Sequence, residues 1–348
     1  MPPLFFEDEE QKSKSTPPGQ SIFLFTNKRT CIYYLIFKIY FSIYMNKHFR
    51  KLTALLFFIY TYNTYAQTSP VQNIFPQGTI TYSNIPYAND TLKKHLLDIY
   101  LPQNAKSNTP LVVWIHGGAW MLNDKYADMG YMKNTVKGFI DNGYALASIN
   151  YRYSTEAAFP AQIQDCNEAL EFLYQHAAQY KIDKDRIALI GFSAGGHLAS
   201  LMGLSNNNDI KEFYPNGNKP HFKIKCVLDF YGPSDFIMLA SNPDTSVNNM
   251  RNPVSILLGA MAVDRPDLAK RASPVTYIDK NDPPFFIVQG EKDESVPNTQ
   301  SRILSSWLTL AGVKNKLTVV PNAPHYGEMF DAESIRKDLF QFLAENLK

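Results

Sequence analysis

The chain has 348 residues, enough for one large α/β domain or two small ones, and its hydrophobic content of 45% supports a sizeable core. Its net charge of +2 is unevenly placed, because residues 1–66 hold eight Lys/Arg and four Asp/Glu and leave 26 basic and 28 acidic residues beyond them. This near-neutral remainder excludes the broad basic field that a nucleic-acid partner requires.

The N-terminal part of the chain carries a targeting pattern. We expect residues 1–44 to be an over-extended translation or a disordered N-terminus. From Met45, basic residues precede an apolar run that ends in small residues suited to cleavage before Gln67. The pattern predicts a signal peptide over 45–66 and a secreted or periplasmic protein. The rival interpretation, an uncleaved membrane anchor, is disfavoured because no uninterrupted apolar stretch reaches about 18 residues.

A polar linker is expected over 67–77, followed by one folded domain over 78–348. Its first two strands, 78–82 and 96–101, are predicted to be antiparallel edge strands, the second because it alternates as a half-exposed strand does. Later apolar runs are typical of buried parallel strands, and they alternate with helical patterns. These strands are expected at 111–115, 145–150, 187–190, 224–231, 284–289 and 316–320, and the helices near 129–142, at 161–180, after residue 193, at 299–311 and at 332–347. The alternation predicts a mostly parallel central sheet with helices on both faces.

Residues 233–280 interrupt this alternation. Prolines and asparagines surround a single amphipathic segment at 253–257. We therefore expect a small cap or lid insertion here, and no second domain.

The motif Gly191-x-Ser193-x-Gly195 stands between an apolar run and a helical pattern. So tight a turn requires small residues two positions on either side of the serine, and it lifts the serine above the sheet edge. The N–H groups of the helix's first turn then surround the serine oxygen. This context predicts a nucleophile at Ser193; the alternative is a Gly-rich turn whose serine only caps the helix.

A serine hydroxyl needs a base at neutral pH, and the base needs an orienting acid. After a nucleophile elbow of this kind, the acid and then the histidine follow the serine along the chain. Only His221 and His325 lie beyond the elbow helix. His221 precedes the next strand and falls at the wrong end of the sheet, so we expect His325 to be the base.

The acid is expected at Asp293, three residues beyond the Gly290 that ends a strand. A buried carboxylate there would hold the tautomer of His325 and stabilise its imidazolium. Glu291 and Glu294 are the nearest competitors, and Asp235 is a further alternative.

Backbone donors must meet the oxyanion of a tetrahedral intermediate. Ala194 offers one N–H at the start of the elbow helix. Gly118 and Ala119 are expected to supply the others, because they follow a strand in a loop of small residues. This loop begins at His116, 77 positions before Ser193. We interpret His116 as a side chain that fixes this loop.

Trp120 and Tyr153 could line the acyl or alcohol pocket, although aromatic residues near loops are as often plain packing. His197, on the elbow helix, is interpreted as a packing residue. Cys166 and Cys226 fall in predicted buried elements, which favours free thiols in the core. The sequence has no H-E-x-x-H, C-x-x-C pair or Gly-rich phosphate loop, so we expect neither a metal nor a nucleotide cofactor.

With these residues in place, the chain resembles α/β-hydrolases of the esterase/lipase group, and is most similar to the BD-FAE-like carbohydrate esterases, relatives of acetylxylan and feruloyl esterases. The resemblance runs from about residue 96 to the C-terminus. It is carried by 97–102, 116–120, 159–162, 191–197, 272–274, Asp293 in Gly-x-x-Asp-x-x-Val-Pro, and Pro324-His325. Relatives commonly have Gly-x-Gly-His where this chain has Ala323-Pro324-His325-Tyr326, a departure that could shift the loop.

The resemblance implies an α/β-hydrolase catalytic domain over 78–348 and hydrolysis of acetyl or hydroxycinnamoyl esters on carbohydrate through an acyl-enzyme. A small-molecule or polysaccharide ester substrate follows, with no cofactor, no nucleic acid and no stable membrane anchor. One alternative is a serine peptidase or amidase of the same fold, which is weakened because such peptidases usually bring an N-terminal propeller domain. Another is a non-catalytic binding module, although such modules typically lose the serine or the histidine.

Overall fold

The computed structural model describes residues 70–208, 210–241 and 249–348. The predicted N-terminal segment 1–44 and signal peptide 45–66 lie outside these residues. Of the helices in the described part of the chain, none combines the length and the apolar character needed to cross a membrane.

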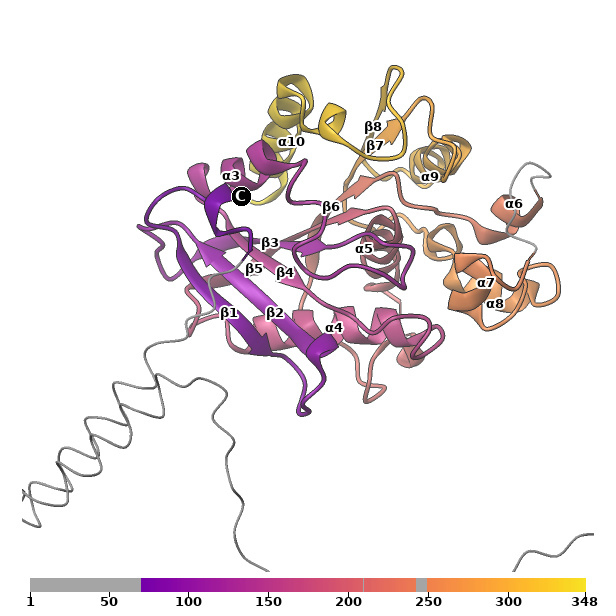
Figure 1. Ribbon diagram of the computed structural model, residues 1–348, viewed down its shortest axis with the longest axis horizontal. Coiled ribbons are helices and arrows are strands. Elements are labelled where there is room, and N and C mark those ends of the chain that lie inside the picture. Colours follow the sequence, from indigo (N-terminus) through magenta and orange to yellow (C-terminus); the bar gives the residue numbers. More distant parts are fainter. Residues whose placement is uncertain (1–69, 209, 242–248) are drawn as a thin grey trace, which may run out of the picture. The chain divides into compact units, whose positions relative to one another are not determined.

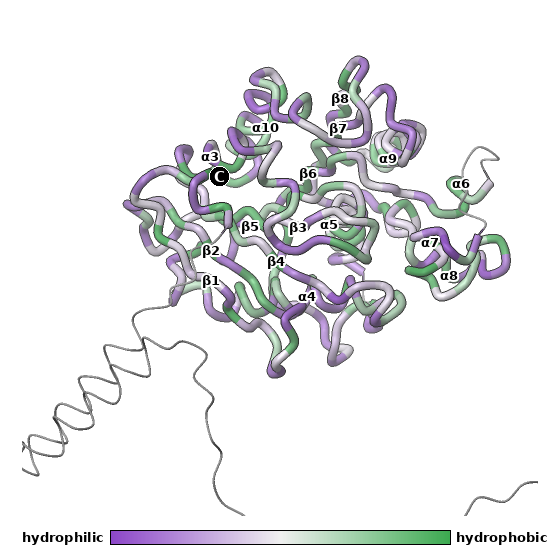
Figure 2. Tube along the Cα trace, in the orientation of Figure 1, coloured by the Kyte–Doolittle hydropathy of each residue, from purple (hydrophilic) through white to green (hydrophobic). Residues whose placement is uncertain are grey.

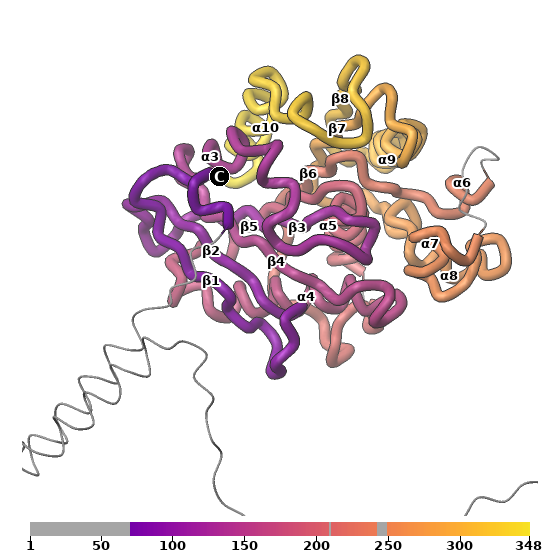
Figure 3. Tube along the Cα trace, in the orientation of Figure 1, coloured from indigo at the N-terminus to yellow at the C-terminus, as the bar shows by residue number. Residues whose placement is uncertain are grey.

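The strands of the described residues form one eight-stranded sheet in the order β1-β2-β4-β3-β5-β6-β7-β8. They are β1 (Ile80–Pro86), β2 (Leu96–Leu101), β3 (Thr109–Ile115), β4 (Ala145–Ile149), β5 (Ile182–Phe192), β6 (Ile224–Phe230), β7 (Phe285–Gly290) and β8 (Asn315–Val320). β2 pairs antiparallel with both β1 and β4, and the remaining neighbours pair parallel. The chain runs from β1 and β2 at one edge to β7 and β8 at the other (Figures 1 and 3). The predicted, mostly parallel sheet is confirmed.

Helices cover both faces of this sheet. One face carries α3 (Lys133–Asp141) and α10 (Glu333–Asn346), and the other carries α4 (Ala161–Gln175), α5 (Ala194–Ser205) and α9 (Thr299–Leu310). Figure 1 shows α3 and α10 together, on the opposite side of the sheet from α4. In β3, Val112 and Trp114 pack into one core cluster and Val113 and Ile115 into the other, because successive strand side chains point to opposite faces. The hydrophobic segments in Figure 2 accordingly include the central strands and α5, which is buried along its whole length.

Strand β2 corrects the prediction of a half-exposed edge strand. It lies between β1 and β4, and the polar members of its alternation, Asp98 and Tyr100, are fully buried. The Phe75 ring stacks on Tyr100 at a centroid distance of 4.0 Å. Asp98 accepts hydrogen bonds from the Asn84 N–H at 2.7 Å and the Tyr100 hydroxyl at 3.0 Å. The alternation therefore reflects a buried polar network, not exposure to solvent.

Of the segment predicted as a linker over 67–77, the described part, 70–77, packs on the folded domain. Val71 and Phe75 are buried in the core cluster beneath α3 and α10, and a 3₁₀ turn, η1 (Gln72–Ile74), separates them. Apolar residues so widely spaced in a polar stretch give no periodic pattern, which is why the packing was not expected.

The described residues of the insertion between β6 and β7 form three short α-helices, α6 (Phe236–Ser241), α7 (Pro253–Leu258) and α8 (Pro266–Ala272), of which only α7 was predicted. Asn252 caps α7 by accepting the N–H of Val254, and Gly259 ends it in a left-handed conformation at φ 70°. The other helix boundaries shift modestly: α3 begins at Lys133 instead of 129, and α4 ends at Gln175 instead of 180. Cys166 and Cys226 are buried free thiols, as predicted.

Candidate active site

Ser193 occupies a tight turn between the end of β5 and the start of α5. Its backbone has φ 52° and ψ −116°, a region that side-chain-bearing residues rarely adopt. A Cβ atom at Gly191 would lie 2.1 Å from the Gly195 carbonyl oxygen, and one at Gly195 would lie 2.0 Å from the Ile115 carbonyl oxygen. The positions two residues before and two residues after Ser193 must therefore be glycine, as the spacing of the motif predicts.

Ser193, His325 and Asp293 form a continuous hydrogen-bonded chain. The Ser193 Oγ lies 2.8 Å from His325 Nε2, and His325 Nδ1 lies 2.7 Å from Asp293 Oδ2. Strands β5, β7 and β8 run parallel in one sheet, with β6 between β5 and β7. Their carboxyl ends therefore lie at the same edge of the sheet, and the loops that carry Ser193, Asp293 and His325 meet there. A Cβ at Gly290 would lie 2.2 Å from the Pro324 carbonyl oxygen, so the histidine loop packs directly on the end of β7. The departure Ala323-Pro324-His325 leaves the histidine within reach of the serine.

The Asp293 carboxylate is held from several sides, and its side chain is fully buried. It accepts the N–H groups of Ser295 at 2.9 Å and Val296 at 2.8 Å, and the amide of Gln289 at 2.8 Å. These donors hold the carboxylate with Oδ2 facing the imidazole. A carboxylate oxygen accepts, so His325 Nδ1 is the donor in this contact and Nε2 is the atom that can accept the serine proton.

The competing residues are placed elsewhere. Asp235 accepts the N–H groups of Ile237 and Met238 and so caps α6. The exposed Glu291 accepts the N–H of Asn322, and Glu294 is exposed. The exposed His221 bonds to Glu171. None of these four side chains has a hydrogen bond to Ser193 or His325 within the described residues.

The loop Gly117–Trp120 follows β3 and faces the elbow. Gly118 and Ala119 have positive φ values of 118° and 53°. In a trans peptide the N–H points opposite to the preceding carbonyl, so fixing that carbonyl fixes the N–H. The Gly117 carbonyl accepts His116 Nδ1 at 2.7 Å, and the Gly118 carbonyl accepts the N–H of Met121 at 3.0 Å. The N–H groups of Gly118 and Ala119 are thereby oriented, and no hydrogen bond within the described residues uses them or that of Ala194.

Two buried histidines support this loop. His116 stacks on Tyr151 at 4.3 Å, and burial lowers its pKa to about 4, so it is a neutral donor at Nδ1. The same effect lowers the pKa of His197 to about 4. His197 donates from Nε2 to the Ala272 carbonyl at 2.7 Å and accepts from the Trp120 indole at 3.2 Å. His116 thus fixes the loop as expected, and His197 does more than pack, because it holds Trp120.

A cavity of about 710 Å³ opens over Ser193 and His325. Trp120 lines it, as predicted, together with Leu239 and Val254 from the insertion. Tyr153 is not among the lining residues; its hydroxyl bonds to the Asn123 carbonyl, and the Lys94 ammonium lies 3.1 Å from its ring centroid. The structure therefore places Tyr153 outside the lining of this cavity.

Asp128, Tyr131 and Tyr231 also line the cavity, and the sequence analysis did not identify them. Tyr131 donates to Asp128 at 2.6 Å and lies 2.9 Å from the Tyr231 hydroxyl, whose ring packs edge-on against His325 at 4.9 Å. Spacing and residue type do not distinguish Asp128 from Asp124 in the same loop, so no local signal marked it. Among the described residues, no cluster of three His, Cys, Asp or Glu side chains is placed to hold a metal ion.

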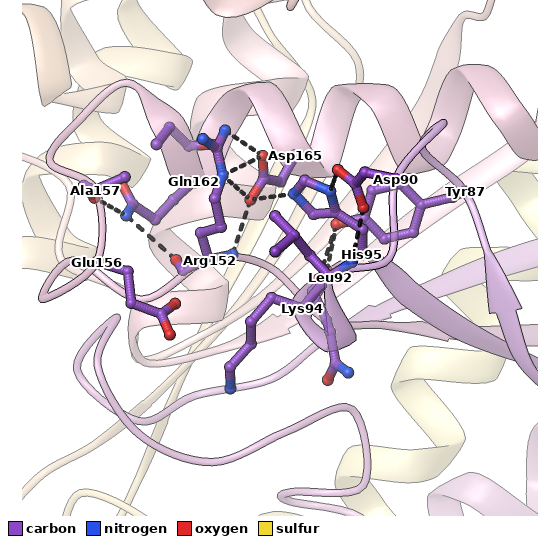
Figure 4. A network of polar contacts seen from close by, with 12 residues as sticks. Tyr87, Asp90, Leu92, Lys94, His95, Arg152, Glu156, Ala157, Gln162 and Asp165 are labelled. Atoms are coloured by element: carbon purple, nitrogen blue, oxygen red, sulfur yellow. Dashed lines mark hydrogen bonds and ion pairs between the residues drawn. The ribbon is translucent and has the colours of Figure 1, made fainter. Parts of the chain in front are cut away.

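A second histidine–aspartate network joins the segment before β2 to α4, outside the cavity lining (Figure 4). His95 Nδ1 lies 2.6 Å from Asp90 Oδ2, and its Nε2 lies 3.4 Å from Asp165 Oδ2. Arg152 binds Asp165 through Nη2 at 2.6 Å and Nε at 2.9 Å. Burial alone would lower the pKa of His95, but Asp165 and Asp90 outweigh it and raise that pKa.

The sheet order, the elbow and the Ser193–His325–Asp293 chain define an α/β-hydrolase. The chain belongs to the BD-FAE family, whose model matches residues 97–308. It is 32% identical over 251 residues to esterase LipQ of Mycobacterium tuberculosis, a match that covers 70% of this chain and 56% of LipQ. The chain thus spans little more than half the length of this curated relative.

Two solved structures are also similar. A truncated form of a carbohydrate esterase from gut microbiota is 31% identical with a TM-score of 0.70, and the match covers 78% of this chain and 98% of that one. A bifunctional GH43-CE protein of Bacteroides eggerthii is 35% identical with a TM-score of 0.71, and the match covers 77% of this chain and 35% of that one.

Proposed function

We propose that the protein is a serine carboxylic-ester hydrolase that acts through an acyl-enzyme. The observation that carries this proposal is the placement of His325 between Ser193 and Asp293, with hydrogen-bond distances of 2.8 and 2.7 Å. A nucleophile, a base and an orienting acid in this order are the parts that acyl transfer requires. The names of the relatives, which are esterases, support an ester over an amide as the substrate.

In the proposed first half-reaction, the Ser193 oxygen attacks the ester carbonyl carbon as His325 Nε2 takes the hydroxyl proton. The carbonyl oxygen becomes an oxyanion, which the N–H groups of Ala194, Gly118 and Ala119 meet. Asp293 stabilises the imidazolium that has formed. The bond from the carbonyl carbon to the alcohol oxygen then breaks, and His325 returns the proton to the leaving alcohol.

In the second half-reaction, water replaces the alcohol. His325 takes a proton from the water as the water oxygen attacks the carbonyl carbon of the acyl-enzyme. The N–H groups of the oxyanion hole again bind the oxyanion of the tetrahedral intermediate. Collapse breaks the bond to the Ser193 oxygen, which regains its proton from His325. The products are the free acid and the original enzyme.

We propose acetyl or hydroxycinnamoyl esters of carbohydrates as the substrates. The cavity of about 710 Å³ exceeds what an acetyl group needs, which leaves room for a sugar or an aromatic acyl group. Apolar lining by Trp120, Leu239 and Val254 suits an acyl chain, whereas Asn123 and the exposed Tyr326 suit a hydroxylated alcohol. Among the described lining residues there is no Lys or Arg, which favours uncharged substrates. The carbohydrate esterase among the similar structures supports the same substrate class.

The test is a screen of the purified protein on acetylated xylo-oligosaccharides, feruloylated oligosaccharides and longer-chain acyl esters, with Ser193→Ala as the control. We expect hydrolysis of the sugar esters, with release of acetate or ferulate, and little hydrolysis by the control. Preferential cleavage of peptide or anilide bonds would replace the proposal with the amidase alternative.

We also propose export, with residues 45–66 as the signal peptide. Expression from Met45 should yield a mature protein that begins at Gln67, which intact-mass measurement would detect. An active, membrane-bound form that retains residues 45–66 would support the anchor instead.

A further inference from the structure

Asp128 is a carboxylate in the wall of the catalytic cavity that the proposed mechanism does not use. It is the only acidic side chain among the described lining residues. Its Oδ2 accepts the Gly117 N–H at 2.7 Å, and its Oδ1 accepts the Tyr131 hydroxyl at 2.6 Å. Burial raises the pKa of Asp128, and the two donors and the nearby His325 oppose that rise. A shielded carboxylate is costly in free energy, so its two bonds must offset that cost.

The first of these bonds fixes the start of the oxyanion loop. The peptide between His116 and Gly117 is held at its carbonyl by the Tyr151 hydroxyl at 2.9 Å and at its N–H by Asp128. A Cβ at Gly117 would lie 3.4 Å from the Asp128 carboxylate and 3.5 Å from Ser193 Cβ, so this peptide lies beside the nucleophile. The peptides that present the Gly118 and Ala119 N–H groups follow directly, and a rotation at Gly117 would turn both.

The second bond leads to the histidine. Tyr131 joins Asp128 to the Tyr231 hydroxyl at 2.9 Å, and the Tyr231 ring packs against His325 at a centroid distance of 4.9 Å and an angle of 60°. Tyr231 has φ 48°, and its backbone N–H donates to the Val288 carbonyl at 2.8 Å. This bond fixes the backbone from which the Tyr231 ring projects. One carboxylate therefore supports both the oxyanion loop and the wall against which the base rests.

We propose that Asp128 is a positioning residue for ester hydrolysis, which holds the Gly118 and Ala119 N–H groups in register with the Ser193 oxygen. The inference rests on the proposed function for its reaction. It assigns Asp128 no contact with the substrate. Its effect belongs to the transition state, because the oxyanion donors act on charge that develops there.

The experiment compares Asp128→Ala and Asp128→Asn with a matched control, Asp331→Ala. Asp331 is likewise a buried aspartate whose two carboxylate oxygens both accept hydrogen bonds, in its case from the backbone N–H groups of Asn134 and Thr135. It lies outside the cavity lining. Asp128→Ala should lower kcat about 10²-fold, the scale of losing one oxyanion donor, with KM within about threefold of wild type. Asp128→Asn keeps an acceptor for the Gly117 N–H and should recover kcat to within about tenfold. Asp331→Ala should lower Tm without lowering kcat of the folded protein.

A second measurement does not depend on turnover. Phenylboronic acid accepts the Ser193 oxygen at boron as the serine proton moves to His325, and the resulting tetrahedral boronate places an oxygen among the oxyanion donors. Asp128→Ala should raise its Kd by a factor similar to the fall in kcat/KM. Asp128→Leu, which fills the same space without an acceptor, gives the same test if the alanine variant does not fold.

The outcomes separate the two proposals. If Asp128→Ala and Asp128→Leu retain kcat and boronate affinity within about threefold while losing Tm as Asp331→Ala does, Asp128 is a structural residue only and the inference is overturned. If wild type hydrolyses no ester, the proposed function fails, and the boronate affinities still decide whether Asp128 positions the loop.

Discussion

Two histidine–aspartate pairs in this protein have almost the same distance between Nδ1 and a carboxylate oxygen, but the second ring nitrogen faces a different kind of group in each. His325 Nδ1 lies 2.7 Å from Asp293, and His95 Nδ1 lies 2.6 Å from Asp90. The second ring nitrogen of His325 lies 2.8 Å from the Ser193 hydroxyl, whereas that of His95 lies 3.4 Å from the carboxylate of Asp165 (Figure 4). One imidazole therefore stands between an acid and a nucleophile, and the other between two acids.

The difference shows that the third partner decides what such a pair can do. Two carboxylates favour the imidazolium, which cannot accept a proton, so the His95 network is suited to joining the segment before β2 to α4. A hydroxyl leaves Nε2 of a neutral imidazole free to act as a base. A short His–Asp distance alone is therefore no sign of a catalytic relay.

The largest expected effect falls on the first pair. Asp293→Asn keeps the shape but favours the wrong tautomer of His325, and should lower kcat about 10⁴-fold. His325→Ala should cost a similar factor, and the double variant little more, since the members of a relay act as a unit. Steady-state kinetics on a chromogenic acetate ester would measure all three. Independent, additive losses would mean that the two residues do not share one relay.

The matched change in the second network should leave catalysis intact and lower stability. Asp165→Asn removes the charge that Arg152 binds, and should lower the free energy of unfolding by about 2–3 kcal/mol, less than for a fully buried pair because Arg152 is partly exposed. Urea unfolding and kcat would be measured on the same preparation. A fall in kcat larger than about threefold would tie this network to the active site and break the comparison.

The smallest effect is a pH dependence of stability that arises in the second pair, at His95. The pKa of His95 is raised by Asp165 and Asp90 against the effect of burial, so the stability from its charge is fully present below about pH 6.5 and is lost as pH rises through its folded pKa.

The difference in unfolding free energy between wild type and His95→Gln isolates the His95 contribution. Arg152 and Glu168 also face this network and are unchanged in both proteins. We expect the difference to be under about 1 kcal/mol and to shrink above pH 7. A difference that grows with pH would contradict the assigned charge of His95.

The relay could be predicted from the sequence because each of its parts is marked locally. The motif Gly191-x-Ser193-x-Gly195 is recognisable because the turn has no room for a Cβ at either glycine. The order of the strands then limits the acid and the histidine to a few positions along the chain. Asp293 and His325 were therefore identifiable before their loops were seen to meet. The buried network of Asp98, and the packing of Phe75 on Tyr100, carry no such mark, because the contacts join segments far apart in the chain.

The same reason explains the misses at the site. Asp128 matters through the N–H of Gly117, eleven positions earlier in a different turn, and its residue type is common in loops. Tyr153 was expected in the cavity from its residue type alone, whereas the route of its loop places the ring outside. Helix α6 was missed because one side chain, Asp235, defines its start and the helix is too short for a periodic pattern.

The most direct test of the account is covalent labelling of the nucleophile. A fluorophosphonate ester should react once per molecule, with loss of fluoride and formation of a bond from phosphorus to the Ser193 oxygen, and peptide mass spectrometry should place the adduct on Ser193. Hydrolysis should disappear in proportion to labelling, and Ser193→Ala should neither react nor hydrolyse ester. Full hydrolytic activity in the alanine variant, or a label on another residue that tracks the loss of activity, would contradict the assignment of Ser193 as the nucleophile.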